Sequence, residues 1–254
     1  MSCLVKPPKS LLRCVGKAIA DYEMIKHQDR ILVGVSGGKD SLSLLHILAH
    51  LQRYAPIHFD VAAITVDPEI EGFDPSVLKA YMAELGIPYF YQEQAIMEQA
   101  QQSMKGDSFC AYCSRMKRGI MYNTARREGY NVLALAQHLD DLAESFLMSA
   151  LYTGSLQTMK ANYLNDAGDV RIIRPLVYVR ERQTRDFAQV AQLPVVPDNC
   201  PACFTKPTKR HHVKTLLAQE EQTHKHVFKS LLHAMRPLML QNASNAVDEM
   251  DEVL

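Results

Sequence analysis

Six residues near the N-terminus have the types and the spacing of a phosphate-binding turn. The stretch ILVGVSGGKDSLSLLHIL, residues 31–48, passes from an apolar β-branched run into two glycines and then into a helical pattern. The glycines let the backbone turn sharply and approach a ligand closely. The free N–H groups and the positive dipole of the following helix favour an anion. We call these residues the glycine turn: Ser36, Gly37, Gly38, Lys39, Asp40 and Ser41.

The spacing of the glycine turn separates it from two common nucleotide-binding motifs. Neither G-x-x-x-x-G-K-S/T nor G-x-G-x-x-G is present at this position. A Gly-Gly turn between a strand and a helix is more often a packing turn than a ligand site. Two serines, a lysine and an aspartate in this order nevertheless favour a phosphate site, because they add hydroxyl donors and a mobile positive charge.

Acidic residues follow two other expected strands. The segment AQHLDD, residues 136–141, contains His138, Asp140 and Asp141, and Asp67 ends another apolar run. Ligands of open parallel sheets lie beyond the carboxyl ends of the strands, so we expect these side chains on the same rim as the glycine turn. An Asp-Asp pair at a helix start can also cap the helix and complement its dipole.

Four of the six cysteines form two C-x-x-C pairs, Cys110 with Cys113 and Cys200 with Cys203. The first pair is expected in a turn just before a basic helix, and the second in a Pro-rich irregular segment. Without a secretory signal, metal or redox chemistry is favoured over disulfides. From spacing alone, a structural zinc site, an iron–sulfur cluster and, less readily, a thioredoxin-like redox pair remain open.

The elements that must position these residues alternate between strand and helix. Apolar runs at 30–35, 59–67, 87–93, 131–137 and 170–179 predict strands, and helical patterns separate them. This alternation predicts an α/β fold with a parallel, doubly wound sheet and helices on both faces.

The composition is ordinary for a soluble globular protein. The chain has 254 residues, 47% of them hydrophobic and 22% charged, enough for one large α/β domain. No apolar run reaches the roughly eighteen residues of a membrane span, and no signal-peptide pattern is present, so we expect a cytoplasmic protein. The formal net charge is zero, but basic residues cluster in several stretches that could bind phosphate backbones. These stretches are 6–17, 115–127, 171–185 and 206–214.

Taken together, the motifs resemble the PP-loop ATP pyrophosphatases, and within them the tRNA 2-thiocytidine biosynthesis (TtcA) family. The signature SGGKDS after an apolar strand carries the first resemblance. The stretches VGKAIADYEMI, CAYCSRMKRGI, RIIRPLVYVRE and NCPAC carry the second, over roughly residues 13–210. The resemblance implies an adenine nucleotide alpha hydrolase-like fold that holds ATP and Mg²⁺ and cleaves ATP between the α- and β-phosphates.

The resemblance also implies roles for particular residues. Lys39, Asp40 and Asp141 would act in catalysis. A 4Fe-4S cluster would be held by three cysteines that match Cys110, Cys113 and Cys203, with Cys200 as the alternative third ligand. Its fourth iron would stay open for a hydrosulfide. The expected ATP and Mg²⁺ ligands are Ser36, Gly37, Gly38, Lys39, Asp40, Ser41, Asp67, His138 and Asp140.

The implied reaction is the thiolation of a tRNA. ATP would adenylate C2 of a cytidine, which the resemblance implies is cytidine 32 of the anticodon loop, and sulfur would replace the oxygen. The implied partners are tRNA, a sulfur donor such as a cysteine desulfurase, and a second copy of the chain. The stretch at 136–141 departs from the family pattern at Ala136, Gln137 and Leu139. A paralogous sulfurtransferase or ligase acting on another tRNA base or a small molecule is therefore the alternative, and a zinc-stabilised nucleotide sensor a third.

We predict three segments along the chain. Residues 1–30 form an N-terminal helical lead-in, and residues 31–195 form the PP-loop ATP-binding domain with the first cysteine pair inserted in it. Residues 196–254 form a cysteine-containing segment followed by a C-terminal helical tail.

Overall fold

The computed structural model describes residues 4–70, 73–96, 99, 109–197 and 208–240. The strands are β1 (Arg30–Gly34), β2 (Asp60–Asp67), β3 (Tyr89–Glu93), β4 (Val132–Ala134), β5 (Asn162–Leu164) and β6 (Arg171–Ile173). The helices are α1 (Lys9–Asp21), α2 (Lys39–Tyr54), α3 (Val77–Leu85), α5 (Phe109–Glu128), α6 (Leu139–Thr153), α7 (Glu181–Val190), α9 (Lys209–Thr223) and α10 (Val227–Met235), with the 3₁₀ helix η1 (Arg236–Met239).

The strands form one six-stranded sheet in the order β3-β2-β1-β4-β6-β5. All neighbours are parallel except β5 and β6, which are antiparallel. From β1 the chain moves outward to β2 and β3 and then returns to β4 on the other side of β1. This reversal creates a topological switch point between β1 and β4, where open α/β sheets bind ligands.

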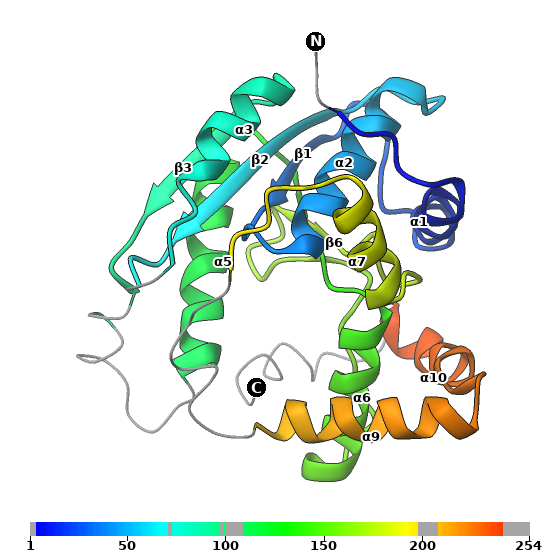
Figure 1. Ribbon diagram of the computed structural model, residues 1–254. Helices are drawn as coiled ribbons and strands as arrows, with labels where there is room; N and C mark the ends of the chain where they lie inside the picture. Colours follow the sequence, from blue (N-terminus) through cyan, green and yellow to red (C-terminus); the bar gives the residue numbers. More distant parts are fainter. Residues whose placement is uncertain (1–3, 71–72, 97–98, 100–108, 198–207, 241–254) are drawn as a thin grey trace.

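Side chains of the central strands alternate between two cores, one on each face of the sheet. In β1, Ile31 and Val33 belong to the larger core, whereas Leu32 belongs to the smaller one. Helices α2 and α7 cover the larger face, and α5 lies across the opposite face (Figure 1). The predicted α/β fold, with a parallel doubly wound sheet and helices on both faces, is confirmed.

The segment expected as one strand at 170–179 is wrong beyond its first residues. Only β6 is a strand there, because the chain turns at Arg174, whose carbonyl accepts from Val177 N–H at 3.3 Å. The preceding β5 was not predicted. It pairs with β6 through a short turn in which Gly168 has φ +72° and its N–H donates to Asn165 O at 2.8 Å.

Both ends of the described chain pack onto the domain. Helix α1 buries Leu11, Val15 and Ala18 in the larger core, as expected of the helical lead-in. Helices α9 and α10 pack against α6 (Figure 1). No helix in the described ranges is long and apolar enough to cross a membrane. The segment boundaries at residues 30 and 195 stay predictions.

Candidate active site

The glycine turn joins β1 to α2 at the carboxyl edge of the sheet. Gly37 has φ +89°, and a Cβ atom there would lie 2.9 Å from the side chain of Val196. The N–H of Val196 donates to Gly37 O at 3.0 Å. Only glycine fits this position without strain, because L side chains rarely adopt this backbone conformation and the segment after α7 packs against the turn.

The turn leaves the start of α2 open. Gly38 is the N-cap residue and provides no side-chain cap. Ser41 Oγ instead donates to Gly38 O at 2.9 Å and lies 3.3 Å from Ser36 Oγ. The first amides of α2 therefore remain available to an anion, next to two hydroxyl groups.

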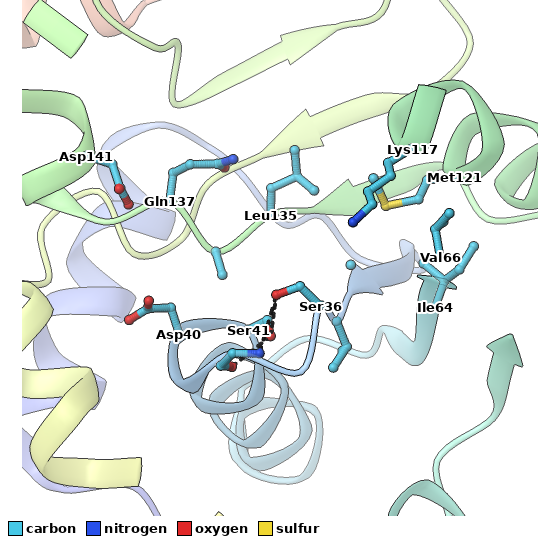
Figure 2. Close-up of a pocket in the computed structure, with 14 residues that line it drawn as sticks. Ser36, Asp40, Ser41, Ile64, Val66, Lys117, Met121, Leu135, Gln137 and Asp141 are labelled. Atoms are coloured by element: carbon cyan, nitrogen blue, oxygen red, sulfur yellow. Dashed lines mark hydrogen bonds between the residues drawn. The ribbon is translucent and has the colours of Figure 1, made fainter. Parts of the chain in front are cut away.

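A cavity of about 280 Å³ lies over the turn. Figure 2 shows the carboxylates of Asp40 and Asp141 on one side of it and the Lys117 ammonium on the opposite side. The cavity thus joins the switch point between β1 and β4 to helix α5. Its lining comprises Gly34, Val35, Ser36, Gly38, Asp40, Ser41, Ile64, Val66, Lys117, Met121, Leu135, Ala136, Gln137 and Asp141.

Asp141 is fixed by the start of α6. Its carboxylate accepts from His138 N–H at 2.9 Å, and its own N–H donates to His138 Nδ1 at 3.3 Å, which is a capping box. Since Nδ1 accepts a hydrogen bond, a neutral His138 carries its proton on Nε2, which lies 3.8 Å from Asp40 Oδ2. His138 is buried and lies outside the described lining of the cavity. It therefore contacts Asp141 through the capping box and not the described cavity.

Asp140 is directed away from the cavity, although it is the neighbour of Asp141. Successive residues of a helix point about 100° apart, so the two carboxylates face different surroundings. Asp140 Oδ1 accepts from Arg180 at 3.0 and 3.1 Å, and Oδ2 accepts from Glu181 N–H at 2.7 Å. Both oxygens are thus occupied by the start of α7.

Lys39 is likewise absent from the described lining of the cavity. Its Nζ lies 2.9 Å from Asp40 Oδ2 and 3.0 Å from Glu181 Oε1. Burial alone would lower the pKa of Lys39, but hydrogen bonds and charges of Asp40 and Glu181 offset it and raise the pKa. The second oxygen of Asp40 accepts from Thr184 Oγ1 at 2.5 Å.

Asp67 lies at the carboxyl end of β2, as expected, but beyond the described cavity lining. It accepts from Tyr91 OH at 2.5 Å and from Glu69 N–H at 2.9 Å. Ile64 and Val66 of the same strand line the cavity instead.

The first cysteine pair lies inside α5, not in a turn before it, which corrects the sequence-based prediction. Cys110 and Cys113 are three residues apart in this helix. Cys113 is half-buried beside the smaller core. Lys117, one turn further along α5, reaches the cavity. Cys200 and Cys203 lie outside the described residues.

Helix α9 brings a second set of charges to the site. Thr208 caps it by accepting from His211 N–H at 3.1 Å. Arg210 Nη1 lies 3.8 Å from Asp141 Oδ1, and Arg210 Nε lies 4.0 Å from Glu144 Oε2. Burial, reinforced by the charge of Asp141, raises the pKa of Glu144 to about 7 although Arg210 opposes the shift.

Comparison with known proteins identifies the family of this chain. The model of the PP-loop domain matches residues 9–221. The chain is 40% identical over 228 residues to the tRNA-cytidine(32) 2-sulfurtransferase of Geobacter sulfurreducens, covering 89% of each chain. It is 42% identical over 228 residues to the protein of that name from Pelobacter propionicus, covering 89% of this chain and 85% of the relative.

The chain belongs to the PP-loop family, in its tRNA-cytidine(32) 2-sulfurtransferase branch. The resemblance inferred from SGGKDS and the cysteine motifs is thereby confirmed. A solved PP-loop structure, the U34-tRNA thiolase NcsA from Methanococcus maripaludis with its 4Fe-4S cluster, superposes with a TM-score of 0.75. It shares 23% sequence identity and covers 91% of this chain and 78% of its own, so this likeness supports the fold.

Sequence reasoning missed the residues of α7 and its N-cap that contact Asp140 and Lys39 next to the cavity. Arg180 and Glu181 lie in the stretch RIIRPLVYVRE, which carried the family resemblance but received no role. Their contacts with Asp140 and Lys39 span long sequence separations, so no local spacing pattern reveals them. Only their charge next to a helix start could have marked them.

Proposed function

We propose that this protein is an ATP-dependent tRNA thiolase, which adenylates C2 of cytidine 32 and replaces its oxygen with sulfur. One observation carries the proposal: a single cavity joins an anion-binding helix start to the helix that carries Cys110 and Cys113. The relatives described above are named for this reaction.

The glycine turn would hold the phosphates of ATP. The open amides of α2 face the cavity with the Ser36 and Ser41 hydroxyls, an arrangement that suits a polyphosphate. Ile64, Val66 and Met121 form an apolar wall that suits a flat nucleobase. Lys117 would neutralise negative charge from the side opposite to Asp40 and Asp141.

Mg²⁺ would be held by Asp40 and Asp141. These two carboxylates share one side of the cavity, and Mg²⁺ prefers one or two carboxylates together with substrate phosphates. Asp140, which was also expected here, would act indirectly by fixing the start of α7 against α6.

The cysteines fit an iron–sulfur cluster by their donor chemistry. Thiolates are the usual ligands of such clusters, and Cys113 lies one helical turn from cavity-lining Lys117. Cys110, Cys113 and Cys203 would hold a 4Fe-4S cluster, with Cys200 as the alternative third ligand. When bound, the cluster supplies the sulfur that replaces the base oxygen.

The protein's own groups would act on the adenylation step. The C2 oxygen of the cytidine attacks the α-phosphorus, and pyrophosphate leaves with charge that the α2 amides and Lys39 stabilise. A base of the anticodon loop suits this site because it can leave its stack without opening a duplex. A cysteine desulfurase as sulfur donor and a homodimer complete the proposal.

The test is product analysis with an RNA control. Anaerobically purified protein is incubated with ATP, Mg²⁺, sulfide and an unmodified tRNA transcript, and digested RNA is analysed by mass spectrometry. We expect AMP and 2-thiocytidine with cytidine at position 32, and no thionucleoside with uridine at that position. Neither AMP nor thionucleoside from the cytidine transcript would refute the proposal.

The cluster has a separate test with a matched control. Cys110→Ala removes a proposed ligand, whereas Cys14→Ala removes a half-buried cysteine of α1 that the proposal does not use. We expect iron and sulfide to fall strongly in the first variant and to match wild type in the second. Equal iron content in both variants would remove Cys110 from the ligand set.

A further inference from the structure

Lys39, the lysine of the glycine turn, is held by a carboxylate from outside the turn. Its Nζ lies 3.0 Å from Glu181 Oε1, and it is absent from the described lining of the cavity. To stabilise phosphate charge, Lys39 must therefore exchange its contact with Glu181 for one with the phosphate, or donate hydrogen bonds to both.

Glu181 is itself held firmly in place. Its side chain is 15% exposed, and its backbone N–H donates to Asp140 Oδ2 at 2.7 Å. Its second oxygen lies 2.8 Å from Lys214 Nζ on α9 and 3.5 Å from Arg185. Burial would raise the pKa of Glu181, but Lys214 and Lys39 lower it to about 2, so the group stays anionic at neutral pH.

We propose that Glu181 is a positioning residue that competes with bound pyrophosphate for the ammonium of Lys39, and that Lys214 sets the strength of this competition. The inference rests on the proposed ATP-dependent function, in which pyrophosphate must leave the glycine turn. When pyrophosphate leaves, Glu181 can pair with Lys39 again, and this ion pair lowers the free energy cost of pyrophosphate release.

Lys39, Glu181 and Lys214 form a series of ion pairs. Within it, replacing Glu181 and replacing Lys214 should have opposite effects on pyrophosphate binding. Removing the charge of Glu181 takes away one of the two carboxylates described beside Lys39 and leaves Asp40, so more of the lysine's charge is available to phosphate and pyrophosphate binds more tightly. Removing Lys214 leaves Glu181 with fewer cations, so Glu181 holds Lys39 more strongly and pyrophosphate binds less tightly. A purely structural clip between α7 and α9 predicts weaker binding in both cases.

The test is calorimetric binding of magnesium pyrophosphate to the full chain. Glu181→Gln is expected to tighten binding about tenfold, or about 1.4 kcal/mol. Lys214→Met is expected to weaken it about threefold, since Lys214 is half exposed and such pairs are weak. In the Glu181→Gln background, Lys214→Met should change the affinity less than about twofold.

Two control variants distinguish the loss of a direct contact with Lys39 from a change in the net charge of this region. Glu221→Gln removes a carboxylate of α9 that pairs with Arg180 instead of Lys39, and Arg182→Met removes an exposed cation near Glu221. Both should leave the pyrophosphate affinity within about twofold of wild type. Thermal melts of every variant establish that the binding is measured on folded protein.

Several results would overturn the inference. These are weaker or unchanged binding in Glu181→Gln, a matching tightening in Glu221→Gln, or the absence of pyrophosphate binding by the wild type. The thiolation assay tests the proposed function separately. If the wild type forms 2-thiocytidine but Glu181→Gln binds pyrophosphate with unchanged affinity, the inference is refuted and the proposed function stands. Tight pyrophosphate binding without thiolation refutes the proposed function instead.

Discussion

Asp140 and Asp141 are adjacent in sequence and equal in chemistry, yet they belong to two different regions. Asp141 and Asp40 line the cavity, whereas Asp140 pairs with Arg180, which also pairs with Glu221, and accepts from Glu181 N–H. In the first region the carboxylates keep protein partners but line the cavity over the glycine turn, whereas in the second the carboxylate of Asp140 is held by Arg180 and the Glu181 amide outside the described lining. The difference shows that the direction of a side chain on its helix, not its residue type, decides whether an aspartate lines the cavity or joins the contacts beside it.

The largest expected effect comes from a change on the cavity side. Asp141→Asn removes a proposed Mg²⁺ ligand but keeps an oxygen that can accept from His138 N–H. We expect AMP formation to fall roughly 10²–10³-fold, in the range seen when one electrostatic group of an active site is lost. The free energy of unfolding should change by less than about 1 kcal/mol. Steady-state kinetics and urea unfolding measure the two quantities, and unchanged kinetics would remove Asp141 from the reaction.

The matched change at Asp140 should act on stability instead. Asp140→Asn removes the charge that faces Arg180, whose side chain is 14% exposed and also contacts Glu221. Because Arg180 keeps one acidic partner, we expect a loss of roughly 2–3 kcal/mol, at or below the low end for breaking a buried pair. Urea unfolding measures this loss. If Asp140→Asn instead abolished ATP binding by folded protein at unchanged stability, the distinction between the two aspartates would be wrong.

A smaller, pH-dependent effect should come from Glu144, which lies near both regions. Its ordinary pKa of 4.5 is raised to about 7 in the folded chain. Between these values the unfolded chain loses the proton first, so this group makes wild-type stability fall as pH rises from about 4.5 to 7. Glu144→Gln stays neutral and should be more stable than wild type above pH 7, by roughly 2 kcal/mol. Unfolding curves at pH 5 and pH 8 measure it; an equal difference at both values would contradict the assignment.

Local patterns in the sequence predict most of the cavity side. The apolar run into Gly37 and Gly38 identifies both β1 and the start of α2, because a strand, a turn and a helix start are read from adjacent residues. The position of Asp141 after β4 follows in the same way. Parallel strands with intervening helices then place both at one rim.

The supporting side is not predictable by the same reasoning. The pairs Arg180–Asp140 and Lys39–Glu181 join residues far apart in sequence, and their partners depend on how α7 and α9 pack. The helical setting of Cys110 and Cys113 was also missed, because the residues before α5 carry no periodic pattern that marks its start. Which of Asp140 and Asp141 lines the cavity depends on the direction of each side chain on α6. The sequence motif places both after the same strand and does not distinguish them.

The coupling of nucleotide activation to sulfur transfer is tested most directly by counting products in one reaction. Anaerobic enzyme, an unmodified tRNA transcript, ATP and sulfide are mixed, and AMP and 2-thiocytidine are quantified together over time. The account predicts that the two products accumulate in equal amounts and stop together when either ATP or tRNA is exhausted. Thionucleoside formed without AMP, or AMP released with no thionucleoside, would contradict it.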